Sequence, residues 1–192
     1  MELDISPSGV APGSANRATG LSIVASRACG TCTMCCKVAA VLEVGKPNGV
    51  WCPHCAKDKR CTIYPSRPQS CRSFYCQWMI EPGLGPEWKP DRAKFALVKT
   101  EFGRRLTALV DPGFPSAWRR APYYENLKQW SLETARRLPE VYLVDVLIGS
   151  RNIVILPDRD VDLGSLDVDE GIQVSQTERG IAVMKVKHNA AA

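Results

Sequence analysis

The sequence predicts an α+β protein in which a small, irregular cysteine-rich module precedes antiparallel β hairpins and one main helix. Three observations carry this prediction. All nine cysteines lie between Cys29 and Cys76, where regular hydrophobic periodicity is absent. Apolar residues bounded by glycine and proline recur in short runs after residue 90, which is typical of strands joined as hairpins. One later stretch has apolar residues at helical spacing.

Three segments are expected along the chain. Residues 1–20 are rich in Ser, Pro, Gly and Ala without periodicity, so they are expected to be a disordered tail. Residues 21–80 would form the cysteine-rich module, which has few large aliphatic residues and would need metal bonds to fold. Residues 88–187 would form an α+β region packed on this module. An irregular connector with three prolines and two glycines, Glu81–Asp91, joins the two.

The region after residue 90 is expected to contain three hairpins and a helix. The paired strands are predicted at Lys94–Thr100 with Arg104–Val110, Val141–Ile148 with Arg151–Leu156, and Gly171–Ser175 with Gly180–Val186. The main helix is predicted at Tyr123–Leu138, because Pro122 lies near its first turn and Pro139 ends it. The acidic motif that begins at Asp158 is predicted to be a solvated turn, since its glycine is misplaced for a calcium loop.

Composition and charge narrow the class of protein. The hydrophobic fraction of 45% and the charged fraction of 23% are those of an ordinary soluble protein. The net charge of +5 counts cysteines as neutral; eight metal-bound thiolates would add about −8, offset by about +4 from two divalent ions. The basic excess therefore predicts no nucleic-acid partner. No apolar run approaches the ~20 residues of a membrane span, so no membrane partner is expected, and an unidentified protein partner is left open.

The cysteine usage indicates a reducing compartment. The N-terminus has acidic residues and lacks the basic and apolar regions of a secretory signal, which predicts a cytoplasmic protein. Cytoplasmic thiols stay reduced, and an odd number of cysteines leaves a disulfide framework one partner short. Metal binding by clustered thiolates is therefore the favoured explanation of the cluster.

The spacing of the cysteines suits metal ligation. Cys29-x2-Cys32-x2-Cys35 places three thiols on one tight wrap around an ion. Cys36 follows directly, and because adjacent side chains point apart, Cys35 and Cys36 are not expected to complete the same tetrahedron. The remaining ligands would come from Cys52, Cys55, Cys61, Cys71 and Cys76. This inventory allows two four-cysteine sites with one cysteine left over.

The metal and the function stay open at this point. The triplet with a distant Cys52-Pro53 resembles the ligand pattern of a 4Fe–4S cluster, whereas any four thiolates satisfy zinc. A cluster would suggest electron transfer or redox sensing; zinc would suggest a structural interaction module without catalytic activity. A third alternative is a thiol–disulfide oxidoreductase using Cys52 and Cys55, although no amphipathic helix follows this C-x-x-C motif. No catalytic residue is identifiable, so enzymatic activity is undecided.

The order of motifs resembles a known family. The matching residues are Cys29-Gly30-x-Cys32-x-x-Cys35-Cys36, Cys52-Pro53-His54, Cys61-Thr62-Ile63-Tyr64, Arg67-Pro68, Cys71-Arg72 and Phe74. They are similar to the CxxCxxCC, or YkgJ-type, proteins, which are described as zinc- or iron-chelating. The resemblance covers residues 28–76 and implies eight metal ligands: Cys29, Cys32, Cys35, Cys36, Cys52, Cys61, Cys71 and Cys76. It also sets Cys55 aside as the extra cysteine, since a leucine usually occupies that place.

Overall fold

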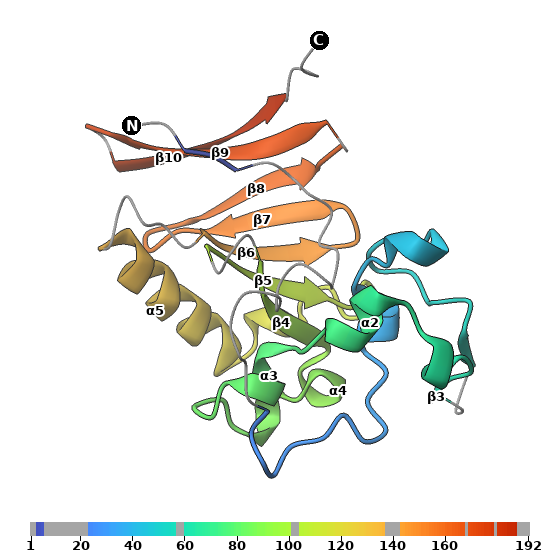
Figure 1. Cartoon of the computed structure of the whole chain (residues 1–192). Helices are drawn as coiled ribbons and strands as arrows, with labels where there is room; N and C mark the ends of the chain where they lie inside the picture. The colour runs from blue at the N-terminus through green and yellow to red at the C-terminus, as the bar shows by residue number, and fades with distance from the viewer. Residues whose placement is uncertain are drawn as a thin grey trace.

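The computed structural model describes residues 3–5, 23–56, 60–100, 104–136, 143–167, 169–178 and 180–187. It confirms the α+β class, with helices and three sheets. Figure 1 shows the cysteine-bearing segment, coloured blue to green, beside a central five-stranded sheet, with a second sheet beyond the far edge of that one. Within the described ranges, no helix is long and apolar enough to cross a membrane.

The central sheet has the strand order β4-β5-β6-β7-β8. Its strands are β4 (Phe95–Thr100), β5 (Arg105–Val110), β6 (Leu143–Ile148), β7 (Arg151–Ile155) and β8 (Asp160–Ser165). The hairpins predicted for β4–β5 and β6–β7 are confirmed as antiparallel pairs. The β5–β6 pair is parallel. The sequence patterns predict antiparallel hairpins and no parallel pair. A parallel pair needs a long crossover, and the main helix, α5 (Tyr123–Ala135), lies in that connection.

The third predicted hairpin is confirmed as β9 (Glu170–Thr177) and β10 (Gly180–Lys187), both longer than expected. A short strand, β1 (Leu3–Ile5), pairs antiparallel with β9, where a disordered tail was expected. The rest of that expected tail, residues 1–2 and 6–20, lies outside the described residues. The sequence missed β1 because three residues are too few to show alternation.

The acidic motif forms part of a strand, so the predicted solvated turn is wrong over most of its length. Asp160 and Asp162 lie on β8. Asp160 accepts a hydrogen bond from the Tyr124 hydroxyl at 3.2 Å and pairs with Lys128 Nζ at 2.9 Å. Asp162 pairs with Arg151 of the neighbouring strand. Cationic partners on α5 and β7 therefore allow carboxylates in this edge strand.

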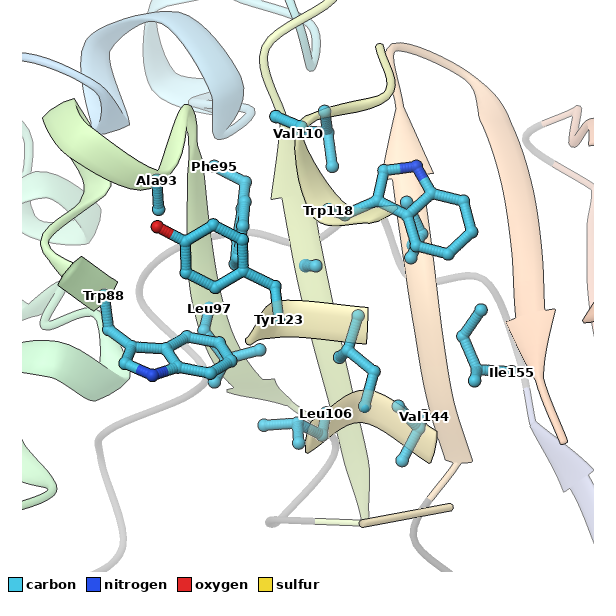
Figure 2. Packing of buried hydrophobic residues seen from close by; sticks show 14 of the residues in the cluster. Trp88, Ala93, Phe95, Leu97, Leu106, Val110, Trp118, Tyr123, Val144 and Ile155 are labelled. Carbon is cyan, nitrogen blue, oxygen red and sulfur yellow. The ribbon is translucent and has the colours of Figure 1, made fainter. Parts of the chain in front are cut away.

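One face of the sheet packs against α5 and the connector. Figure 2 shows aromatic and aliphatic side chains from both layers meeting in this core. The rings of Trp88 and Tyr123 are 5.0 Å apart at their centroids, and both contact Phe95 edge-on. Leu127 of α5 is completely buried in the same cluster. This face therefore has an ordinary hydrophobic core that needs no metal ion.

The opposite face of β4 and β5 packs against the cysteine-rich module. Ala96, Val98 and Leu109 lie in one buried cluster with residues of the module that include Val38 and Met79. An ion pair adds to this contact, since Lys37 Nζ lies 2.5 Å from a carboxylate oxygen of Asp111. The module is thus held to the sheet by its first and last segments.

A buried polar network lies on this second face of the sheet. Asp145 is fully buried and accepts hydrogen bonds from Arg105 Nε at 3.0 Å and from Thr107 Oγ1 at 2.7 Å. Asn152 Nδ2 donates to its other oxygen at 2.5 Å. These three neighbours come from β5 and β7, which flank β6. A buried carboxylate with so many donors favours this register of the three strands.

The module itself consists of short elements joined by turns. They are α1 (Cys35–Val38), η1 (Leu42–Val44), β2 (Cys55–Ala56), β3 (Arg60–Cys61), η2 (Tyr64–Ser66), α2 (Gln69–Ser73) and α3 (Gln77–Ile80). The connector that follows contains η3 (Pro86–Trp88) and α4 (Pro90–Ala93), and η5 (Ala117–Arg119) precedes α5. These segments agree with the expected irregular architecture of the cysteine-rich stretch.

We predict that Leu127→Ala destabilises the protein by about 2–5 kcal/mol, because it opens a cavity in the core beneath α5. Gln129→Ala on the exposed side of the same helix is the matched control and should change stability by less than about 0.5 kcal/mol. Urea unfolding followed by circular dichroism measures both. Equal, small effects of the two substitutions would contradict the packing described for this helix.

Candidate metal centre

The nine cysteines are all free thiols and all lie in the described residues. Thiol–thiol interactions link them into two groups. The three-cysteine group comprises Cys29, Cys32 and Cys76. The six-cysteine group comprises Cys35, Cys36, Cys52, Cys55, Cys61 and Cys71. Cys35 interacts with thiols of the larger group, and the expectation that Cys29, Cys32 and Cys35 surround one ion stays a prediction.

The hairpin of β2 and β3 places two cysteines of the larger group side by side. Cys55 is directly opposite Cys61 in the strand register. The flanking residues form a hydrogen-bonded pair, since the Thr62 N–H donates to the His54 carbonyl at 2.8 Å. Cys55 and Cys61 are therefore a non-hydrogen-bonded pair, the kind whose side chains approach more closely on one face. This position brings Cys55 into the group although the family resemblance sets it aside.

Cys36 connects the hairpin to α1. Its backbone carbonyl accepts a hydrogen bond from the Cys52 N–H at 2.8 Å, and its thiol interacts with those of Cys35 and Cys55. The hydrogen bond with Cys35, with burial adding to it, raises the pKa of Cys36 far above its ordinary value. The expectation that Cys35 and Cys36 do not complete the same tetrahedron stays a prediction.

Cys71 is positioned in the six-cysteine group by hydrogen bonds between η1 and α2. The Glu43 carboxylate accepts hydrogen bonds from the Ser70 N–H at 3.1 Å and from its hydroxyl at 2.8 Å. This fixes the start of α2 and places the next residue, Cys71, near Cys36 and Cys52. Burial raises the pKa of the Cys71 thiol, and its like-charged neighbours add to the effect. Such mutual repulsion between thiolates is what a bound cation relieves.

Lys46 places a positive charge beside the six-cysteine group. Its side chain is buried, and Nζ donates to the carbonyls of Lys37 at 3.0 Å, Pro47 at 3.1 Å and Ala39. Burial lowers the pKa of Lys46, while the nearby thiolates, with Cys52 first among them, oppose that shift. The amine thus satisfies carbonyls at the end of α1 and can offset thiolate charge.

The three-cysteine group forms where the start of the module meets α3. The Val24 N–H donates to the Met79 carbonyl at 3.0 Å. The Arg27 guanidinium donates to four carbonyls of the segment after Cys76: Trp78, Glu81, Pro82 and Leu84. Cys32 packs on the buried cluster that contains Cys76. These contacts bring Cys29 and Cys32 beside a cysteine more than forty residues away in the chain.

Backbone amides face the sulfur atoms of this group. Burial raises the pKa of Cys76 to about 12, although the N–H groups of Met79 and Trp78 favour its thiolate and oppose the shift. Burial likewise raises the pKa of Cys32, against hydrogen bonds from the amides of Met34 and Asp91. Both thiols are buried acids with donors already aimed at their anionic form, which suits them as metal ligands.

The thiols of the described residues are suitable donors for a metal ion, but they do not lie close enough together to coordinate one. Among them, no group of three or more His, Cys, Asp or Glu side chains is arranged closely enough to hold a metal ion as it stands. The donor set is nevertheless the one that zinc and iron–sulfur clusters use. Binding would therefore require the sulfur atoms to draw together.

The C-x-x-C motif of Cys52 and Cys55 lies in a turn that leads into β2. The Cys55 N–H donates to the Cys52 carbonyl at 2.9 Å, and the residues that follow form a strand. Burial, followed by the neighbouring Cys36, raises the pKa of Cys55 to about 11. A thiol–disulfide oxidoreductase instead places this motif at a helix N-terminus, which lowers the thiol pKa. The local structure therefore gives no support to the oxidoreductase alternative.

The segment that carries four of the cysteines has almost no hydrophobic core. Of the described residues between Val50 and Tyr75, Ser70 alone is buried. Val50, Trp51 and Tyr64 are more than half exposed. Burial of apolar surface is the main force that folds small domains, so this segment needs another source of stability.

Comparison with known proteins gives no relative: no family model matches the chain, and neither does any curated protein or solved structure. The resemblance to the CxxCxxCC proteins therefore stays a prediction. The structure adds two features that no sequence signal indicates: the buried amine of Lys46 and the proximity of Asp91 to Cys32. Cys55, which the spacing included and the resemblance set aside, lies opposite Cys61.

We predict that Lys46→Met lowers the free energy of unfolding by about 1–3 kcal/mol, because three carbonyls lose their buried donor. Lys185→Met is the control, since that side chain is exposed on β10 and its ion pair with Glu170 spans 3.6 Å; it should change stability by under about 1 kcal/mol. Urea titration of both variants measures the difference. A Lys46→Met protein as stable as the control would contradict the stabilising role given to this amine.

Proposed function

We propose that the chain is a metal-binding protein whose cysteine-rich module is folded by metal–thiolate bonds. The observation that carries this proposal is the segment Val50–Tyr75, which buries almost nothing yet holds four free thiols of the six-cysteine group. Without apolar burial or disulfides, its fixed conformation needs other bonds. Metal coordination supplies them in small domains of this kind, where binding energy becomes folding energy.

The ligands of the proposed centres are the eight cysteines that the family resemblance implies, together with Cys55. Division of the thiols into two groups supports more than one centre, because no single ion or cluster takes nine thiolates. The position of Cys55 opposite Cys61 supports adding it to the ligands of the larger group. Free thiols suit a reducing compartment, so a cytoplasmic location remains part of the proposal.

Zinc and an iron–sulfur cluster imply different functions. Zinc held by thiolates is redox-inert and closed, which would make the module a structural one that serves an interaction with another protein. An iron–sulfur cluster would make it an electron carrier or redox sensor, and the exposure of Cys29 would bring the smaller group near the surface. No residue arrangement described above supports a catalytic step.

We expect the protein, purified without oxygen, to contain at least one zinc or one iron–sulfur cluster per chain. Elemental analysis, assay of acid-labile sulfide and a visible spectrum on the same sample distinguish the two. Iron with sulfide and a broad absorption would support electron transfer or sensing; zinc alone would support a structural module. A chain that retains free thiols but takes up neither metal would refute the proposed function.

We further expect metal removal to loosen the module while the rest of the fold persists. After treatment with a chelator, trypsin should cut after Arg60 and Arg72 at least about tenfold faster, since local unfolding governs such cleavage. Arg67 is no probe, because Pro68 follows it. Cleavage after the exposed Arg119 of η5 should keep its rate and serves as the internal control.

Equal cleavage after Arg60 and Arg72 in the metal-loaded and chelated protein would contradict metal-dependent folding of this segment. Accelerated cleavage at every site, including the one after Arg119, would instead mean that the metal stabilises the whole chain. Restoring the original rates with added metal would show that the loss is reversible and not caused by thiol oxidation.

A further inference from the structure

The hairpin of β2 and β3 brings two thiols together through backbone pairing. Cys55 and Cys61 are opposite each other in the strand register, and both are free. They form a non-hydrogen-bonded pair, because in the adjacent pair the Thr62 N–H donates to the His54 carbonyl at 2.8 Å. The Cα atoms of such a pair lie about 4.5 Å apart, and the two side chains leave the ladder on the same face.

This placement meets the main geometric requirement for a disulfide bond. Disulfides join residues whose Cα atoms are about 4.4–6.8 Å apart, a range that includes the spacing of a non-hydrogen-bonded pair. Five residues separate Cys55 from Cys61, so closing the ring costs little chain entropy. Neither side chain is fully buried, which leaves both accessible to a small oxidant. Bond formation therefore requires rotation of two side chains and no change in strand pairing.

Two other thiols near Cys55 are competitors for the same bond. Cys52 lies three residues earlier in a turn, which the Cys55 N–H closes by donating to the Cys52 carbonyl at 2.9 Å. Cys36 is connected to this turn through its carbonyl, which accepts from the Cys52 N–H at 2.8 Å. Within the described strands, however, the register places Cys61 alone opposite Cys55. Backbone pairing therefore favours Cys61 as its partner.

The charge between the two cysteines suits an anionic oxidant. Residues 56–60 include three basic residues and one acidic residue, and Arg60 is exposed. A local positive charge attracts small anions and raises their concentration near the surface. Glutathione disulfide is a small disulfide that carries carboxylates, so it fits both the charge of this hairpin and the chemistry of thiol exchange.

We propose that Cys55 and Cys61 are a reversible oxidation site, at which a small anionic disulfide such as glutathione disulfide converts the two thiols into an intramolecular disulfide. Disulfides of this transient kind occur in reducing compartments as redox sensors. The inference goes beyond the proposed function, since the bond needs no metal ion. Where that function also holds, oxidation would remove two ligands from the six-cysteine group.

The reaction is two successive thiol–disulfide exchanges. The Cys61 thiolate attacks one sulfur of glutathione disulfide and forms a mixed disulfide; the first glutathione leaves as a thiolate and takes up a proton. Cys55 then gives up its proton and attacks Cys61 Sγ, which forms the new S–S bond and releases the second glutathione. Two protein thiols are oxidised, and one glutathione disulfide is reduced to two glutathione thiols. Cys55 acts second because burial raises its pKa to about 11.

The test is incubation of the reduced full-length chain, purified without oxygen, with excess glutathione disulfide. Free thiols are then alkylated, and the chain is digested with trypsin for mass spectrometry. Trypsin releases Cys55 in fragment 38–57 and Cys61 in fragment 61–72, and because each fragment has one other cysteine, sequencing of the linked pair assigns the bond. We expect the Cys55–Cys61 link to exceed any other by at least about tenfold, since paired strands raise the effective concentration of the two thiols. Reduced glutathione should remove it.

The same chain unfolded in urea is the matched control, since it keeps the sequence spacing and loses the strand register. Its links should be distributed over several cysteine pairs. Cys61→Ser should abolish the link between the two fragments, whereas Cys71→Ser should retain it. Linkage of Cys55 to Cys36 or Cys52 in the native chain, the same links in native and unfolded chain, or no link at all would overturn the proposal. Metal content, measured on the same sample before oxidation, tests the proposed function separately.

Discussion

The structure depends on a constraint between Val50 and Tyr75: the segment that carries Cys52, Cys55, Cys61 and Cys71 has almost no hydrophobic core of its own. Only Ser70 is buried between Val50 and Tyr75 in the described part of the chain. Its contacts to the rest are polar and sparse, such as the tie from Ser70 to Glu43. Under the proposed function, the thiols would hold the segment through a metal ion that they share.

The remainder of the chain supplies a rigid support for this module. One face of the central sheet is closed by α5 and the connector, and the other receives α1 and α3. Because the sheet folds on its own hydrophobic core, it can position the two ends of the module before any metal binds. The ion pair of Lys37 with Asp111 connects the α1 end of the module to the sheet. The hydrogen bonds from Arg27 to the carbonyls of Glu81 and Leu84 connect the start of the module to the segment after α3. Metal binding would then have to order only the middle of the module.

Sequence patterns predicted most of the fold because local rules decide it. The three hairpins and the helix at Tyr123 follow from alternation, helical spacing and proline placement, which depend on neighbouring residues alone. The parallel β5–β6 pair and strand β8 were not predicted, because neither is decided by neighbouring residues. Both are set by partners distant in sequence, such as the cations that pair with Asp160 and Asp162.

The candidate site, too, has features that the sequence could predict and features that depend on distant contacts. Spacing identified the cysteines as candidate ligands, but it counts positions along the chain, whereas the grouping of the thiols depends on distant contacts. Cys35 joins Cys36 since a helix begins there, and Cys29 and Cys32 join Cys76 since Arg27 anchors the start of the module beside α3. The cysteines of each group thus come from segments that distant contacts bring together, so a metal ion bound as proposed would be taken up after the sheet has folded.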